Sequence, residues 1–383
     1  MEKTFRQQFI EFDWSKSEPL HALLCTPGVA LPLILGMHFG YPGTAALMVG
    51  GAQTVGFGSY QQPLFHKSGA MIYATIGIAL SAFVGALCRD STTALVLATA
   101  LWAFVYGLSN SISPATAWVG QQCCVFLVIS SAAPSTPGSP TELFTAAALR
   151  GIGVLAGGAL QTILLRTFRH WWPQAQTRFT VPDFDPTHFQ RKFLLDQLTI
   201  RSGAFQFSLR MLVTGVAATL LYRHQTWTSA YWIGMTALLL PKPEFTQTAL
   251  RSLWRAAGTL SGAALCTAIV VELHPQGQAL SALVILFLFV SYLLNAVNYG
   301  AFVIALTGYI CFVLAVAHQP PHEVLQHRVL ATLLGSGLAA GIHVLFLAYR
   351  KLFNIAPPTL HSLEERMGLA ESPGGGHEQT AAQ

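Results

Sequence analysis

Long apolar runs separated by short polar connections dominate the chain between residues 20 and 349. Each run is continuously apolar over about 15 to 24 residues, and a helix needs about 20 residues to cross ~30 Å of hydrocarbon. Strands of a membrane barrel would alternate apolar and polar positions over about 10 residues. The pattern therefore predicts an all-α polytopic membrane protein with about twelve transmembrane helices. The predicted spans are 20–39, 41–59, 68–88, 91–109, 113–133, 143–165, 205–222, 227–241, 252–272, 277–294, 297–318 and 328–349.

Polar segments divide the predicted spans into two groups of six. The longest polar connection, 166–204, contains several arginines and three prolines and is expected to be a cytoplasmic linker. It separates a first six-span repeat at 20–165 from a second at 205–349. Residues 1–19 mix aromatic and charged side chains, as an interfacial helix does, and lack the basic start and cleavage site of a signal peptide. We expect them to stay on the mature chain, and we expect 350–383 to form a flexible tail.

Short sequence matches indicate that the two halves arose by duplication, with a repeat of about 180 residues. Because each copy has six spans, an even number, both copies would enter the membrane in the same orientation, as parallel repeats. The matched positions are Gly28 with Gly215, Met48 with Met235, Arg150 with Arg328, and Gly157 with Gly335.

Composition and charge agree with a membrane protein and add an orientation. Hydrophobic residues make up 52% of the chain and charged residues only 10%. With both termini in the cytoplasm, 15 of the 21 lysines and arginines fall in cytoplasmic segments, which is the usual bias of membrane proteins. We therefore expect the N- and C-termini to lie in the cytoplasm.

Four arginines lie within or beside predicted spans. Arg210 and Arg255 fall near the cytoplasmic beginnings of the seventh and ninth spans, Arg150 in the outer third of the sixth, and Arg328 at the start of the twelfth. An arginine at mid-bilayer costs ~2.5–3.5 kcal/mol on insertion scales, so such residues usually face a cavity, a partner or the interface. For Arg210 and Arg255, snorkelling to the headgroups is the alternative. Together, the four would make a water-filled pathway attractive to anions.

Polar and aromatic residues within the spans are further candidates for the pathway. Gln53 and Asn298 offer amides, while Tyr231, Trp232 and Tyr299 offer aromatic surface to an apolar substrate body. The alternatives are hydrogen bonds between helices for the amides and interface anchoring or helix packing for the aromatics.

Glycines spaced four residues apart predict close helix packing in three spans, because small residues let two backbones approach. The pairs are Gly153 and Gly157, Gly258 and Gly262, and Gly337 and Gly341.

Several enzyme signatures are absent from the sequence. There is no GxxxxGK[ST] phosphate loop, and HEVLQH at 322–327 has one residue too many for the HExxH zinc motif. The six cysteines follow no metal or disulfide spacing, and the basic residues are too sparse for a nucleic-acid surface. We therefore expect no enzymatic activity, no cofactor, no metal and no nucleic-acid partner.

The segment YWIGMTALLLPKPEFTQTALRSLWRAAGTLSGA, 231–263, resembles the signature of the FUSC family of fusaric acid resistance proteins and aromatic acid exporters. That signature joins an aromatic-rich span and a Pro-containing turn to a span with an Arg, a Gly-Thr pair and another Gly. NYGAFVIALT and HRVLATLLGSGLAA resemble the closing spans, so the resemblance covers about 205–349. The first half departs from the pattern, and the large cytoplasmic domain of many relatives is replaced by about 39 residues.

The resemblance implies a bacterial inner-membrane protein that exports aromatic carboxylic acids or related amphipathic anions from the cytoplasm. A more distant relationship to plant malate channels implies anion conduction. The leading hypothesis is thus an organic-anion exporter with its pathway between the halves. Alternatives are an anion channel and a non-transporting scaffold or assembly factor. The expected partners are the lipid bilayer and a small organic anion, with a periplasmic adaptor or homo-oligomerisation in addition.

Overall fold

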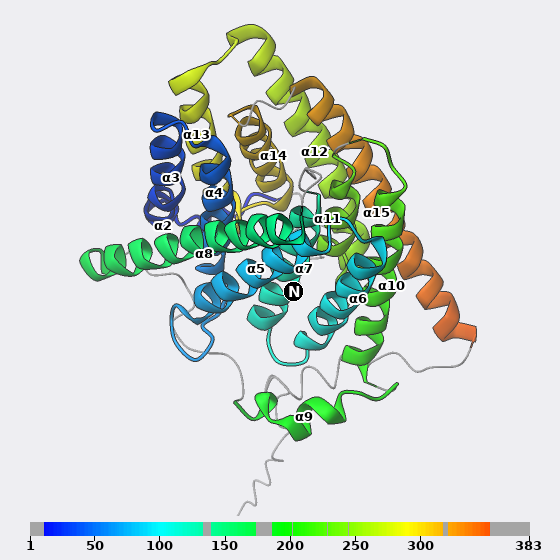
Figure 1. The fold of residues 1–383 in the computed structure, drawn as a ribbon. Helices are drawn as coiled ribbons and strands as arrows, with labels where there is room; N and C mark the ends of the chain where they lie inside the picture. The colour runs from blue at the N-terminus through cyan, green and yellow to red at the C-terminus, as the bar shows by residue number, and fades with distance from the viewer. Residues whose placement is uncertain are drawn as a thin grey trace, which may run out of the picture.

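The computed structural model describes residues 11–132, 139–173, 186–200, 202–227, 229–243, 245–316 and 321–352, and their secondary structure is helical apart from one isolated bridge. The tail from 353, like residues 1–10, lies outside this part of the chain. The elements are η1 Trp14–Lys16, α2 Pro19–Cys25, α3 Pro27–His38, α4 Pro42–Gly58, α5 Gly69–Leu87, α6 Thr92–Ser109, α7 Pro114–Ser131, α8 Pro140–Trp171, η3 Pro186–Phe189, α9 Arg191–Asp196, α10 Gly203–Arg223, α11 Tyr231–Leu239, α12 Phe245–Leu273, α13 Gly277–Leu294, α14 Tyr299–Val316 and α15 Pro321–Leu352 (Figure 1).

Local sequence sets where several helices begin. Helices α2, α3, α4, α7 and α8 start with proline, whose missing N–H costs nothing in the first turn. Ser91, Ser113 and Ser139 cap α6, α7 and α8 through their hydroxyls, which satisfy one of the free N–H groups at a helix start. Proline and serine residues thus fix where these helices begin.

Nine helical segments in the described part of the chain are long and apolar enough to cross a membrane. The predicted all-helical membrane architecture is confirmed, but three of the twelve predicted spans fall short of this measure. Helix α4 has only 17 residues, and α11 has nine and is about 14 Å long. Helix α7 is continuous, but Gln121 and Gln122 interrupt its apolar sequence. Polar and short segments of this kind are tolerated in a membrane protein where they line a cavity.

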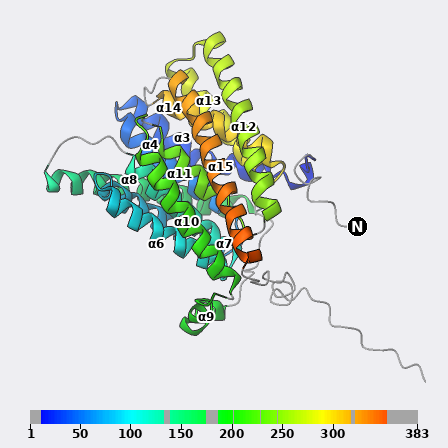
Figure 2. The ribbon, with the colours of Figure 1, turned by 90° about the vertical axis from the view of Figure 1, so that its right-hand side faces the viewer.

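The helices of the two halves pack in the same order. In the first half, α8 packs on α4 and α5, α5 packs on α7, and α7 on α6. In the second half, α15 packs on α11 and α12, α12 packs on α14, and α14 on α13. Figures 1 and 2 show α12 and α15 side by side in the second half.

The halves meet at two places. Helix α10 packs against α6 and α11 against α7, while α13 packs against α2 and α3. The N-terminal helices therefore lie beside the yellow helix α13 of the second half (Figure 1). The space between these two contact regions is where the candidate site lies.

Glycines of α8 bring it close to α4. A Cβ atom added to Gly157 would lie 2.0 Å from the carbonyl oxygen of Met48, and one added to Gly153 would lie 3.0 Å from Cβ of Leu47. Since real Cβ contacts are longer than this, neither position accepts a larger side chain without a shift of the neighbouring helix. Close approach of the two backbones is the usual role of such a pair.

The other two glycine pairs differ from each other. Gly258 and Gly262 of α12 face α14, where an added Cβ would lie 2.8 Å from its nearest side-chain atom in both cases. Gly337 and Gly341 of α15 have nothing within 4 Å of an added Cβ. The helix-packing prediction does not hold for this last pair, because the face of α15 that carries it has no helix against it among the described residues.

Candidate anion-binding cavity

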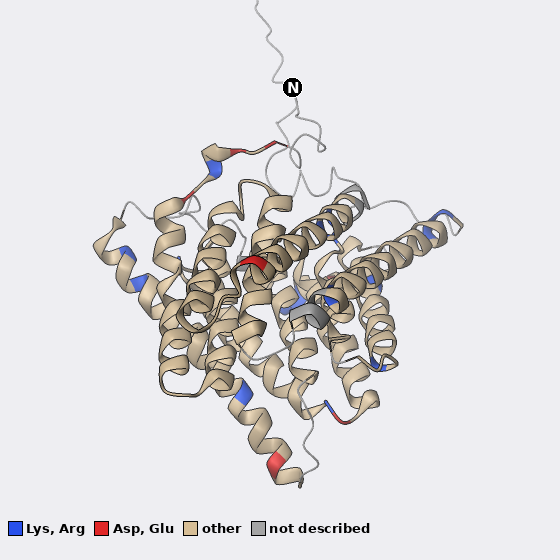
Figure 3. Ribbon diagram, turned by 90° about the horizontal axis from the view of Figure 1, so that it is seen from above, with Lys and Arg blue, Asp and Glu red and all other residues tan. Residues whose placement is uncertain are grey.

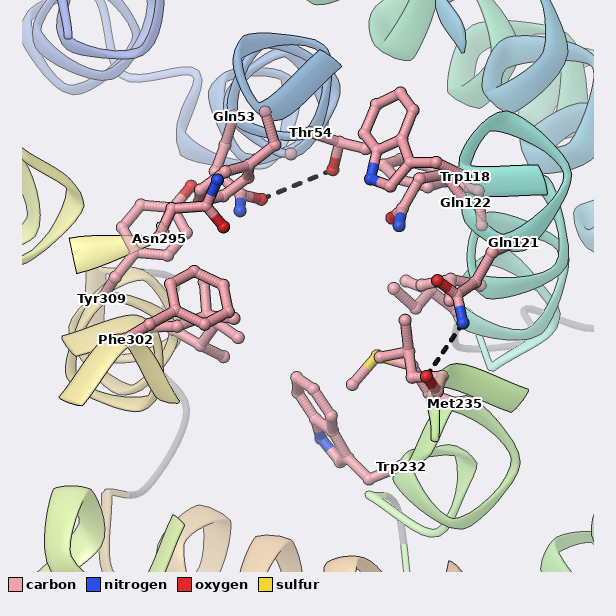
Figure 4. A pocket seen from close by; sticks show the side chains of 18 of the residues that line it. Gln53, Thr54, Trp118, Gln121, Gln122, Trp232, Met235, Asn295, Phe302 and Tyr309 are labelled. Carbon is pink, nitrogen blue, oxygen red and sulfur yellow. Dashed lines mark hydrogen bonds between the residues drawn. The ribbon is translucent and has the colours of Figure 1, made fainter. Parts of the chain in front are cut away.

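A cavity of about 790 Å³ lies between the two halves of the molecule. Helices α4, α7 and α8 contribute its wall from the first half, and α11, α12 and α14 from the second. Figure 4 shows side chains of α4, α7, α11 and α14 around one central space. The three helices that fall short of the membrane-span measure, α4, α7 and α11, all line this cavity.

Amide side chains form the polar part of the wall. Gln53, Gln121, Gln122 and Asn295 all line the cavity (Figure 4). The Nε2 group of Gln121 donates to the carbonyl oxygen of Leu239 at 2.8 Å. Because Leu239 ends α11, this bond satisfies one of the carbonyls that a helix C-terminus leaves without an intrahelical partner.

Aromatic rings form much of the remaining wall. Phe57, Trp118, Trp232, Phe302 and Tyr309 line it, from helices of both halves. The rings of Phe57 and Phe302 meet edge to face with their centroids 5.5 Å apart. Such a wall offers apolar contact to the body of a ligand while the amides orient its polar atoms.

Every charged residue that lines the cavity is a cation: these residues are Arg150, Lys242, Arg251 and Arg255, and no aspartate or glutamate in the described part of the chain joins them. Acidic residues are few and lie elsewhere along the ribbon (Figure 3). A confined space with charges of one sign concentrates ions of the opposite sign. The cavity is therefore electrostatically suited to anions.

Lys242, in the connection between α11 and α12, and Arg251, near the start of α12, both line the cavity. Burial lowers the pKa of the Lys242 ammonium to about 7, and the positive charge of Arg251 contributes to this shift. Both effects disfavour the charged form of a lysine. The guanidinium of Arg251 lies over the ring of Tyr299 at 5.2 Å from its centroid.

Arg255 lies one helical turn beyond Arg251 on α12. Its side chain is only 5% exposed, and its Nε atom has no hydrogen-bond partner among the described residues. A buried guanidinium normally pairs its N–H groups, and Arg255 is a lining residue of the cavity with one such group unpaired. Planar guanidinium groups are well matched to carboxylates.

Arg210 does not line the cavity but supports its wall. It is 7% exposed, its Nη1 atom lies 2.6 Å from Nδ1 of His343, and its Nη2 group donates to the carbonyl oxygen of Lys242. An arginine cannot accept a hydrogen bond, so Nδ1 of His343 is the acceptor. Arg210 therefore ties α10 to α15 and to the turn that carries Lys242.

The remaining predicted residues divide between the cavity and its surroundings. Gln53, Tyr231, Trp232 and Tyr299 line it together with Arg150 and Arg255. Asn298 does not; its Oδ1 atom accepts from the backbone N–H of Ala301 at 3.0 Å, at the start of α14. Arg328 also lies outside the lining, with its guanidinium 4.2 Å from the ring centroid of Trp232.

Sequence reasoning missed several lining residues. Lys242 and Arg251 were visible as charges in the turn region, but they were counted only toward orientation. Trp118, Phe302 and Tyr309 carried no usable signal, because an aromatic residue facing a cavity and one facing lipid look alike in a sequence. Within the described residues, no group of three or more histidine, cysteine, aspartate or glutamate side chains converges on a point where a metal would bind.

The fold and the cavity define a helical membrane protein with a cation-lined space between two halves. Residues 214–342 match the family described as fusaric acid resistance protein-like, which confirms the resemblance seen in the sequence for this part of the second half. A curated relative, an uncharacterized protein of Synechocystis sp. (strain ATCC 27184 / PCC 6803 / Kazusa), is 31% identical over 150 residues. The match covers 39% of this chain and 20% of that relative. No solved structure matches the chain.

Proposed function

We propose that the protein is a bacterial inner-membrane transporter, not an enzyme, that exports organic anions through the cavity between its halves. The observation that carries this proposal is the charge of the cavity wall: four cations line it, and no carboxylate of the described residues does. The match of residues 214–342 to the fusaric acid resistance protein-like family supports the same conclusion.

The proposed substrates are carboxylic acids with an aromatic or similarly apolar body. The cavity combines aromatic rings with amides and guanidinium groups, which suits a molecule with one charged end. Its volume of about 790 Å³ is within the ~300–1,000 Å³ of typical small-molecule sites.

We further propose that the membrane part consists of two parallel six-span repeats. The equal packing order of the two halves supports this. So do the matched glycines: Gly157 packs against α4 at Met48, and Gly335 packs against α11, with an added Cβ 2.7 Å from the carbonyl oxygen of Ile233. Met48 and Met235 are the corresponding methionines of α4 and α11.

The test is flux in reconstituted liposomes. Purified protein would be assayed with radiolabelled benzoate under an imposed pH gradient, an imposed voltage or neither. Saturable flux that is driven uphill by a gradient is the expected result. Flux that follows voltage alone would make the protein an anion channel, and no flux over a broad panel of acids would contradict transport and favour a scaffold.

Replacing Arg255 by glutamine should lower benzoate flux by about tenfold or more, because one hydrogen bond to a charged partner contributes ~1.5–3 kcal/mol. The matched control is Arg166→Gln on the exposed side of α8, which should leave flux unchanged. Both variants should be recovered as folded protein in similar amounts. Equal flux through Arg255→Gln and the wild type would remove Arg255 from the pathway.

A further inference from the structure

Arg328 is the most deeply buried arginine of α15. It does not line the cavity, but it contacts Trp232, which does. Its side chain is 1% exposed, and its Nε and Nη1 atoms have no hydrogen-bond partner among the described residues. Two unsatisfied donors on one buried cation are costly. Helix α15 carries this cost at a position that the predicted duplication pairs with Arg150.

The side chain of Trp232 both lines the cavity and contacts Arg328. Trp232 lines the cavity, and its ring centroid lies 4.2 Å from the guanidinium carbon of Arg328. A cation over the face of an indole is attracted by the ring, so the indole serves as the partner of Arg328 in place of an anion. The indole is itself 5% exposed, and Figure 4 shows it reaching from α11 toward the central space.

In the first half, the arginine that corresponds to Arg328 has no counterpart of the Trp232 ring. Arg150, the counterpart of Arg328, lines the cavity directly. Counting from the matched methionines Met48 and Met235, the position that corresponds to Trp232 is Ala45. Alanine has no ring to lay over a guanidinium, so one arginine of the pair is open to the cavity and the other is closed.

We propose that Arg328 is a second binding site for carboxylate or a similar oxyanion, and that the Trp232 indole is the gate that closes this site from the cavity. When the indole leaves the guanidinium, the free donors of Arg328 become accessible to an anion. An anion at Arg328 and the indole compete for one cation, so only one of them occupies it at a time. This proposal rests on the proposed anion transport and names a step within it.

The experiment compares Trp232→Ala, Trp232→Leu and Trp232→Phe with the wild type by equilibrium binding of radiolabelled benzoate to purified protein in detergent. Removing the ring should open the second site and raise the benzoate bound per chain at saturation by about twofold. The leucine variant fills more of the vacated volume in case the alanine variant does not fold. The phenylalanine variant keeps a ring over Arg328 and should show no gain in the benzoate bound per chain at saturation.

Adding Arg328→Gln to Trp232→Ala should return binding to the wild-type amount, whereas adding Arg255→Gln should leave the Arg328-dependent part in place. If Trp232→Ala and Trp232→Leu bind no more benzoate than the wild type, the gate is overturned while anion binding by the wild type stands. If the gain survives Arg328→Gln, Arg328 is not the second site. If no variant and no wild-type protein binds benzoate, the proposed function itself fails.

Discussion

Lys242 makes the charge of the cavity dependent on pH. It lines the cavity with Arg251, and its pKa is lowered to about 7 by burial and by that neighbouring charge. The protonated lysine attracts an anion, and the proton is lost as the pH rises through about 7. Anion affinity should therefore be highest below this pH and fall above it.

Benzoate affinity should fall by about tenfold between pH 6 and pH 8, a factor equivalent to ~1.4 kcal/mol. Benzoate stays ionised over this range, so the change reports on the protein. Lys242→Arg keeps its charge throughout and should bind with an affinity that is nearly independent of pH. Equilibrium binding at several pH values measures this. If the affinity of Lys242→Arg falls with pH as that of the wild type does, Lys242 is not the titrating group.

The sequence identified the arginines inside the predicted spans, but it did not show which of them line the cavity. Arg255 was predictable as a pathway residue because a cation inside an apolar span needs a reason. Arg210 and Arg328 drew attention for the same reason, but one holds a turn carbonyl and the other lies beneath an indole. Contacts between residues 32 and 96 positions apart decide these roles, and no local pattern contains them.

At the scale of elements, hydropathy identified the helices better than it counted the membrane crossings. The segments that fall short, α4, α7 and α11, are short or carry glutamines, and each lines the cavity. The glutamines that line the cavity lower the mean hydropathy of α7, whereas α4 and α11 are too short for the membrane-span measure. The three helices that the count leaves out are thus among those that form the candidate site.

Glycine substitutions distinguish close helix contacts from open helix faces. Gly157→Ala places a methyl group 2.0 Å from the backbone oxygen of Met48, and should destabilise the protein by about 1–3 kcal/mol, as overpacking does. Gly337→Ala meets nothing within 4 Å and is the matched control. Thermal unfolding in detergent measures both. Equal melting temperatures for the two variants would contradict the contact between α8 and α4.

For the whole molecule, the number of crossings fixes which side each end of the chain occupies. Twelve crossings, with α4, α7 and α11 included, place both termini on the cytoplasmic side, whereas nine place them on opposite sides. Green fluorescent protein at either terminus should fluoresce, and alkaline phosphatase fused after Thr226 should be active outside. Fluorescence at one terminus only would reject the twelve-span arrangement.

The hydrogen bonds at the end of α11 have a consequence for how an anion enters. A helix C-terminus carries negative partial charge from its last carbonyls, and this end of α11 precedes Lys242 at the cavity. Gln121 donates to the carbonyl oxygens of residues 238 and 239, and Arg210 to that of residue 242. The repulsive end of the α11 dipole is thus neutralised by donors from α7 and α10, which leaves Lys242 and Arg251 to set the potential that an arriving anion meets.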